Sequence, residues 1–369
     1  MKFLAQKEDL LKTLKVFNKI KSFPYNVLLE ISAENNILKF TGGNGNFCHS
    51  TFIDAEVKSK GKIYVNPKIL INIINPLPRK ADIEFKDKKD SININCCNSK
   101  YNLLKISESV IENVFTHAPS EAKFKKLTAV NFGVFKERLS KALNFTKKGE
   151  KYDVSQLLGV LFYFNGNLNM TATNSYYLYT TELKNSKGKE FSTILDSDDL
   201  SAILPLDYSN FTDVVFFMSE NSKIVKIVID KNEFYFTPIS GKYPDFQDFL
   251  DETINYKSKF DVETEPLLKS IELANQVESC TSIKITPKKI KVSTNGDKDA
   301  DNFENIISCT SNSSGNVNFN ANFMTKILKS VSVKELSMFF TKDVNKPIRI
   351  IPKDSNDEVF LLAPMNTDN

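Results

Sequence analysis

Lysine residues recur at helical spacing near the start of this 369-residue chain. Lys12, Lys15 and Lys19 lie three and four residues apart, which places them on one face of a helix, opposite a row of leucines. A row of ammonium groups can bind the phosphates of a nucleic acid without reading its bases. Lysines on an exposed helix face can equally serve to keep that face solvated, so both interpretations stay open for any single lysine.

Basic residues continue on the helices predicted further along, at falling density. The row is clear in the first third of the chain, moderate in the middle third and thin in the last, where Glu272 shares the face. The net charge of +4 permits a polyanionic partner without demanding one. The candidates for phosphate contact are Lys12, Lys15, Lys19, Lys21, Arg79, Lys80, Lys136, Lys141, Lys147, Lys148, Lys269, Lys326 and Lys329.

The side chains that usually perform catalysis form no recognisable constellation. His49 and His117, the two histidines, stand outside known motifs, and Cys48 beside His49 has no second Cys or His pair at metal-ligand spacing. The carboxylates of residues 196–199 are better explained as groups at a helix N-terminus, where negative charge is favourable. The sequence therefore predicts a protein that is not an enzyme and binds no metal or cofactor.

Composition places the chain among ordinary globular proteins. Charged residues are 25% and hydrophobic residues 41% of the sequence, and the length predicts two or three domains. Five cysteines, an odd number, favour a reducing compartment over a disulfide framework. The N-terminus turns charged within eight residues, and no apolar run approaches the roughly 20 residues of a membrane span. We therefore expect a cytoplasmic protein.

The elements that would position these residues recur three times, once every 120–135 residues. An apolar strand and an amphipathic helix open each third, and the helices cover residues 10–20, 135–145 and 267–277. A second strand, a polar cap and a short amphipathic helix follow at residues 63–74, 192–204 and 318–328. A pair of strands around a polar turn closes each third, at residues 91–104, 224–236 and 348–362.

This repeat predicts an α+β fold of three similar domains in tandem, each with two helices and antiparallel sheets. The boundaries fall near Pro119 and after Leu250, which gives domains of residues 1–122, 123–250 and 251–369. Three similar domains in a row usually form a surface or a ring, not one deep catalytic cleft.

Five short segments, in order along the chain, resemble the bacterial sliding clamp, the beta subunit of DNA polymerase III. They are Met1-Lys2-Phe3 with the helix that follows, Leu157–Phe162, Ala172–Leu178, Gly241–Phe246 and Leu361–Met365. The second is similar to the family's Leu-Asn-Gly-x-Leu-Phe, the third to its Ala-Thr-Asp-Gly-Tyr-Arg-Leu, and the fourth to its Gly-x-Phe-Pro-Asp-Tyr. Each is short, but their order and spacing together are fairly specific.

The resemblance implies a DNA polymerase processivity factor that encircles duplex DNA without sequence specificity. Its partners would be duplex DNA, the polymerase catalytic subunit and the clamp loader. It also implies a pocket between domains two and three that accepts short apolar peptides. By position, the pocket would be lined by Leu157, Thr173, Ser175, Tyr176, Tyr177, Leu178, Pro244, Asp248, Phe249, Leu361, Leu362, Pro364 and Met365. For Leu157, Leu178 and Leu361, a place in the plain core is an equal alternative.

The chain departs from the family pattern at several pocket positions. Asn174 and Ser175 replace its Asp-Gly pair, Tyr177 replaces its Arg, and Asn366 replaces a basic residue. Less positive charge at the rim predicts a preference for more apolar, less acidic motifs. An alternative is a clamp-fold paralogue that acts as a scaffold with an altered pocket. An enzyme built on repeated α+β domains is a third hypothesis, but it lacks a polar cluster at a domain junction.

Strand edges at the two ends of the chain predict closure by a second copy. Head-to-tail pairing of domain one with domain three would give a ring-forming homodimer of six domains. We expect Tyr101 and Leu103, on the last strand of domain one, and Val277, after the domain-three helix, to lie in that interface.

Overall fold

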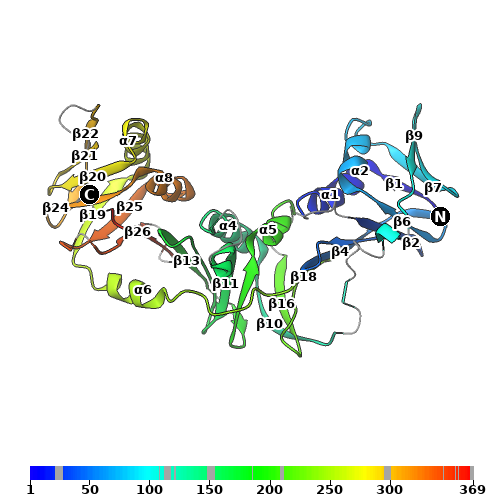
Figure 1. The fold of residues 1–369 in the computed structure, drawn as a ribbon, viewed down its shortest axis with the longest axis horizontal. Coiled ribbons are helices and arrows are strands. Elements are labelled where there is room, and N and C mark those ends of the chain that lie inside the picture. The colour runs from blue at the N-terminus through cyan, green and yellow to red at the C-terminus, as the bar shows by residue number, and fades with distance from the viewer. Residues whose placement is uncertain are drawn as a thin grey trace. The chain divides into compact units, whose positions relative to one another are not determined.

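The computed structural model of the chain describes residues 1–20, 28–107, 109–111, 118–119, 122–147, 154–184, 186–207, 212–294, 301–343, 345–353, 355 and 357–365. Lys21, His117, Lys148 and Asn366 lie outside this part of the chain. The chain divides into two compact units (Figure 1). The first unit comprises Met1–Ser140, Tyr163–Leu168 and Asn185–Ile239, and the second comprises Lys141–Phe162, Asn169–Lys184 and Ser240–Asn369.

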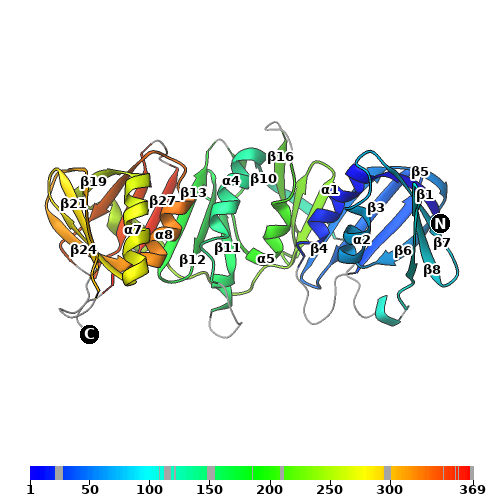
Figure 2. The same cartoon turned by 90° about the horizontal axis from the view of Figure 1, so that it is seen from above.

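The first unit contains two antiparallel sheets, and α1 and α2 lie side by side in it (Figures 1 and 2). Its helices are α1 (Lys7–Phe17), α2 (Pro67–Ile74), α4 (Phe132–Ala142), α5 (Ser197–Leu200) and the 3-10 helix η2 (Ser201–Ile203). Its strands are β1 (Lys2–Gln6), β2 (Leu29–Glu34), β3 (Ile37–Gly43), β4 (Phe47–Asp54), β5 (Glu56–Ser59), β6 (Gly61–Val65), β7 (Asp82–Asp87), β8 (Ser91–Cys96), β9 (Ser99–Leu104), β10 (Phe124–Asn131), β14 (Lys187–Gly188), β15 (Phe191–Asp196), β16 (Asp213–Ser219), β17 (Val225–Ile229) and β18 (Asn232–Phe236). One sheet has the order β5-β1-β7-β8-β9 and the other β14-β10-β16-β17-β18-β4-β3-β2-β6.

The second unit is built in the same way, and α7 and α8 lie side by side in it (Figures 1 and 2). Its helices are the 3-10 helix η1 (Ser155–Leu158), α6 (Gln247–Ile254), α7 (Thr264–Val277) and α8 (Ala321–Ser330). Its strands are β11 (Gly159–Phe164), β12 (Leu168–Thr173), β13 (Tyr177–Leu183), β19 (Ser258–Glu263), β20 (Cys280–Ile285), β21 (Lys289–Thr294), β22 (Glu304–Ser308), β23 (Thr310–Ser311), β24 (Gly315–Asn320), β25 (Glu335–Phe340), β26 (Ile348–Pro352) and β27 (Glu358–Leu362). The strands run β11-β12-β13-β27-β26-β25-β19-β23 in one sheet and β22-β21-β20-β24 in the other.

The predicted threefold order of elements is confirmed, and the fold is α+β. A strand leads into a helix at β1–α1, β10–α4 and β19–α7, and a second strand leads into a second helix at β6–α2, β15–α5 and β24–α8. An antiparallel hairpin closes each third, at β8–β9, β17–β18 and β26–β27.

Polar caps start the second helix of each repeat, as the sequence predicts. The side-chain oxygen of Asn66 accepts hydrogen bonds from two backbone amides of α2, and Pro67 occupies the first turn, where no amide donor is needed. Asp196 caps α5 and Asn320 caps α8 through the same kind of bond. The centre of each apolar helix face is fully buried, at Leu10, Leu14, Phe135, Leu139, Leu267 and Ile271.

The longer sheet of the first unit joins segments that are far apart in the sequence. β4 pairs antiparallel with β18, so that Phe47 stands opposite Phe236 and His49 opposite Phe234. The ring centroids of Phe47 and Phe236 are 5.0 Å apart, and those of His49 and Phe234 are 4.4 Å apart. Aromatic packing therefore fixes this junction from inside the core.

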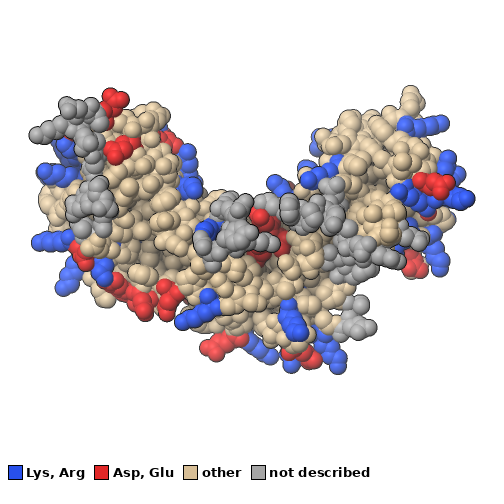
Figure 3. Space-filling view, viewed as in Figure 1, with Lys and Arg blue, Asp and Glu red and all other residues tan. Residues whose placement is uncertain are grey.

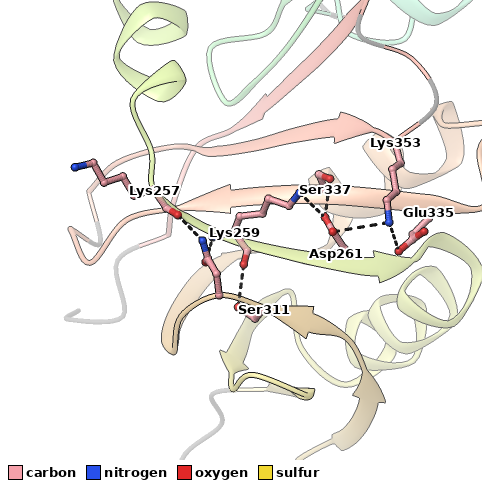
Figure 4. A network of polar contacts seen from close by, with 8 residues as sticks. Lys257, Lys259, Asp261, Ser311, Glu335, Ser337 and Lys353 are labelled. Carbon is pink, nitrogen blue, oxygen red and sulfur yellow. Dashed lines mark hydrogen bonds and ion pairs between the residues drawn. The ribbon is translucent and has the colours of Figure 1, made fainter.

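Polar contacts hold the edge of the longer sheet in the second unit (Figure 4). Asp261 on β19 accepts a hydrogen bond of 2.6 Å from the hydroxyl of Ser337 on β25, and it lies 3.3 Å from the ammonium of Lys259 and 3.8 Å from that of Lys353. The Ser311 hydroxyl donates a 2.9 Å hydrogen bond to the Lys259 carbonyl, which ties β23 to β19.

Within the described ranges, no helix has both the length and the apolar character to cross a membrane.

Candidate functional site

The second unit contains a cavity of about 390 Å³ with mainly apolar walls. We call it the apolar pocket. Most of the residues predicted for the peptide pocket line it: Leu157, Thr173, Ser175, Tyr176, Tyr177, Leu178, Pro244, Phe249, Leu361 and Pro364. Apolar walls with a few polar groups at the rim suit a peptide that inserts one or two large side chains.

Strand pairing places the floor of the apolar pocket. Leu178 on β13 stands opposite Leu361 on β27, and both are buried together with Leu250 of α6. Phe246 packs against this cluster. The buried Tyr243 hydroxyl accepts a hydrogen bond of 3.1 Å from the Thr173 amide, and burial raises the pKa of this phenol well above its usual value. These contacts join β12, β13, β27 and α6 around one cavity.

The turn between β12 and β13 forms one wall, and its altered residues keep a defined geometry. The Asn174 side-chain oxygen accepts hydrogen bonds from the amides of Tyr176 at 3.0 Å and Tyr177 at 3.1 Å. Ser175 has a φ of 81°, in the left-handed region that favours glycine, at a cost of about 1 kcal/mol for a residue with a Cβ. The turn therefore forms without the Asp-Gly pair of the family pattern.

Three residues predicted for the pocket do not line it. Asp248 is exposed on α6, and Leu362 is fully buried, because neighbouring residues of a strand point to opposite faces and Leu361 takes the pocket side. The Met365 amide donates a 2.9 Å hydrogen bond to the Asn318 carbonyl, beside β24. Five lining residues were not predicted: Asp245, Phe246, Asn345, Pro347 and Ala363. Phe246 and Ala363 adjoin recognised segments, but nothing in the sequence links Asn345 or Pro347 to the pocket.

Tyr177 is fixed in an aromatic cluster at one side of the apolar pocket. Its ring centroid lies 5.2 Å from that of Phe145, edge to face, and 5.2 Å from that of Phe323 on α8. Tyr176 stacks on Phe323 at 5.3 Å and keeps 58% of its surface exposed. The Lys326 ammonium donates a 3.3 Å hydrogen bond to the Tyr177 hydroxyl and lies 5.6 Å from the centroid of its ring.

An open row of lysines lies on and just after α1, because the helix ends at Phe17 and Lys19 follows it by two residues. Lys12, Lys15 and Lys19 are all exposed, and no carboxylate of the described residues forms an ion pair with them. Lys80 is also exposed, whereas the neighbouring Arg79 lies 3.0 Å from the Glu8 carboxylate. Figure 3 shows acidic side chains lying among the basic ones elsewhere on the face that it draws.

Other predicted phosphate contacts are engaged within the protein. Lys141 is 11% exposed and lies 2.9 Å from the Glu358 carboxylate, which also accepts a 2.9 Å hydrogen bond from the Tyr179 hydroxyl. Lys136 donates to the Leu206 carbonyl. Lys269 pairs with Glu265 at 2.7 Å, Lys329 pairs with Glu272 at 2.8 Å, and the partly buried Lys147 lines one cavity together with Tyr177. An ammonium already paired with a carboxylate offers little net charge to a phosphate.

The residues weighed for catalysis or metal binding serve the core. His49 is fully buried, its Nε2 lies 3.0 Å from Asn232 Oδ1, and burial lowers its pKa to about 3. Burial raises the pKa of the Cys48 thiol to about 12. Asp199, a buried residue of α5, has its pKa raised to about 7 by burial and then by the charge of Asp196. None of these side chains faces a cavity described above.

The predicted interface residues lie on an edge strand and at the end of a helix. Tyr101 and Leu103 are half-buried on β9, which is an edge strand, and the neighbouring Leu104 is 79% exposed. Val277 is the last residue of α7 and is 40% exposed. The edge strand β22 exposes Ile306, a residue that sequence reasoning missed, at 57%.

Comparison with known proteins gives one consistent family. A family model described as DNA polymerase III beta subunit, N-terminal domain, matches residues 1–114. The chain is 23% identical to the beta sliding clamp of Rickettsia felis over 99% of both chains, and 21% identical to that of Rickettsia bellii over 91% of both. A solved sliding clamp of Pseudomonas aeruginosa bound to griselimycin matches with a TM-score of 0.87 at 16% identity, covering 99% of each chain.

Proposed function

Since the chain is a divergent member of the bacterial beta sliding clamp family, we propose that it is a DNA polymerase processivity factor. It would encircle duplex DNA and tether the polymerase without catalysing a reaction itself. The observation that carries this proposal is the correspondence with clamps over 99% of the chain, in sequence and in fold. A replication clamp acts on the chromosome, so we expect it in the cytoplasm.

Contact with DNA would run through phosphates, because a sliding protein must hold duplex DNA without reading its sequence. The exposed, carboxylate-free row of Lys12, Lys15 and Lys19 supports this most directly. Lys80 is also exposed in the same unit, and the paired lysines would contribute less. The apolar pocket would accept peptide motifs of the polymerase catalytic subunit and of the clamp loader.

A second copy would complete the molecule. The β9 edge of one protomer and the β22 edge of its partner would pair head to tail, with Leu104, Ile306 and Val277 buried between them. Two such contacts close a ring, which is what allows a clamp to stay on DNA without binding it tightly.

Retention on DNA of defined topology tests the proposal. The protein is loaded onto nicked circular DNA with the clamp loader and ATP, separated by gel filtration, and then challenged by a restriction enzyme that cuts the circle once. We expect retention on the circle and loss after cutting, with a heat-inactivated enzyme as the control. Equal retention on both forms would contradict encirclement. Retention without binding of a polymerase peptide would support the scaffold paralogue instead.

A further inference from the structure

A second cavity adjoins the apolar pocket in the same unit, and nothing in the proposed function uses it. Its volume is about 460 Å³, and Tyr176 and Tyr177 belong to the walls of both cavities. Three lysines line it: Lys147, Lys326 and Lys329. We call it the lysine cavity. A ligand that fills the apolar pocket and continues past the two tyrosines would enter a cationic environment.

Lys326 is the lysine whose charge is best placed for such a ligand. Lys329 is already 2.8 Å from the Glu272 carboxylate. The Lys326 ammonium instead rests on Tyr177, with the hydroxyl at 3.3 Å and the ring centroid at 5.6 Å, and none of the described carboxylates forms an ion pair with it. A hydroxyl and an aromatic face orient an ammonium without neutralising it.

Tyr177 in turn is held by its own neighbours. It is 3% exposed, and Phe145 and Phe323 pack against its ring. The Lys326 ammonium therefore lies against a tyrosine ring that is itself packed against two phenylalanines. Tyr177 lines both the apolar pocket and the lysine cavity.

We propose that Lys326 restores the positive charge that the family pattern places at position 177, and that the lysine cavity binds a carboxylate of the partner peptide. The proposal rests on the proposed function, since it concerns the segment that flanks the motif in the apolar pocket. Reasoning from positions 177 and 366 alone predicts a less acidic motif, whereas the structure adds a cation from α8. An acidic peptide satisfies both cavities at once, because it has apolar anchors for one and a carboxylate for the other.

Binding of two matched peptides tests this. Both synthetic peptides carry the same Leu and Phe anchors. They differ at one position beside the anchors, which is Asp in one peptide and Asn in the other. The pair is made twice, with this position before the anchors and with it after them. At low salt we expect the full-length protein to bind the Asp peptide about three- to tenfold more tightly, the range of one partly screened charge pair. Lys326→Gln should abolish that preference and leave binding of the Asn peptide unchanged.

Lys329→Gln is the matched control, because this lysine lines the same cavity but is paired with Glu272. It should keep the preference, and thermal unfolding should show that both variants are folded. Equal binding of the two peptides, a preference for Asn, or the same loss in Lys329→Gln would overturn the inference and leave the clamp proposal intact. If neither peptide binds, the proposal that the apolar pocket accepts a partner peptide is wrong, and the result on circular DNA is a separate test of encirclement.

A nucleic acid is the competing occupant. A single-stranded oligonucleotide whose binding falls in Lys326→Gln, while the peptide preference persists, would assign the cavity to phosphate and overturn the carboxylate proposal. The sequence also offers Lys326 for phosphate contact. Because its ammonium rests on Tyr177 instead, we expect Lys326→Gln to leave oligonucleotide binding and retention on circular DNA unchanged.

Discussion

Among the described residues, Asp199 has a carboxyl group whose pKa is raised close to neutral pH. It is 5% exposed, and its Oδ1 accepts a 2.7 Å hydrogen bond from the side-chain amide of Asn44. Burial, and then the charge of Asp196, raise its pKa from 3.8 to about 7. Between these two values the folded state holds a proton that the unfolded state has released. The free energy of unfolding therefore falls as the pH rises through this window.

Asp199→Asn should remove this penalty. At pH 8 we expect the variant to be more stable than the parent by about 2–4 kcal/mol, since each unit of pKa shift corresponds to about 1.4 kcal/mol. Near pH 4, where the parent is protonated, the difference should be under about 1 kcal/mol. Urea unfolding at the two pH values measures both. Asp198→Asn, at an exposed neighbour, should change little, and an equal effect of Asp199→Asn at both pH values would contradict the pKa assignment.

At the residue scale, the sequence predicts the role of a side chain where that role depends only on its neighbours in the sequence. Asn66 and Pro67 mark a helix start whatever lies around them. Lys141 and Lys326 show the opposite case. Glu358, which neutralises Lys141, is 217 residues away, and Tyr177, which orients Lys326, is 149 residues away. Spacing along one helix cannot reveal either partner, so the lysines looked alike in the sequence.

Among the elements, α1 and the turn that follows it carry the open row of Lys12, Lys15 and Lys19. These exposed lysines lack carboxylate partners among the described residues, whereas Lys269 on α7 and Lys329 on α8 both have one. The acidic residues of α1, Glu8 and Asp9, lie in its first turn, where they favour the helix itself. We therefore expect α1 to dominate non-specific DNA binding by the first unit.

Removing the α1 row tests that expectation. Lys12→Ala, Lys15→Ala and Lys19→Ala together should weaken binding to short linear duplex DNA and lower the slope of log K against log salt by up to about 3, at nearly one per phosphate contact. The variant Lys60→Ala, Lys88→Ala and Lys89→Ala removes the same charge from other exposed positions of the unit. A similar loss in this control would mean that net charge matters and the α1 face does not.

On the scale of the whole molecule, the main feature is that each of two sheets ends in an edge strand that carries an exposed apolar side chain. β9 ends one sheet of the first unit and exposes Leu104, and β22 ends a sheet of the second unit and exposes Ile306. Exposed apolar side chains on an edge strand favour pairing with another chain. The repeat of the sequence predicts this need for closure, but the most exposed residues emerge only from the structure.

A charge at the edge should therefore separate the protomers. Light scattering should give a mass of twice 41.9 kDa for the parent and close to 41.9 kDa for Leu104→Glu at micromolar concentration, because a buried unpaired carboxylate costs several kcal/mol. Ile254→Glu, at a 63% exposed residue of α6, should remain dimeric. A parent protein with the mass of a single chain would contradict the proposed ring-forming dimer.

The pairing of β4 with β18 also has a consequence for biosynthesis. His49 reaches its partner Asn232 only after 183 further residues have been added. At bacterial elongation rates of about 5–20 residues per second, that delay is about 10–40 s. During this interval the nascent chain exposes β4, with Phe47 on it, as an unprotected strand edge. The same strand that anchors the finished core therefore stays open to pairing with other chains until β18 has been made.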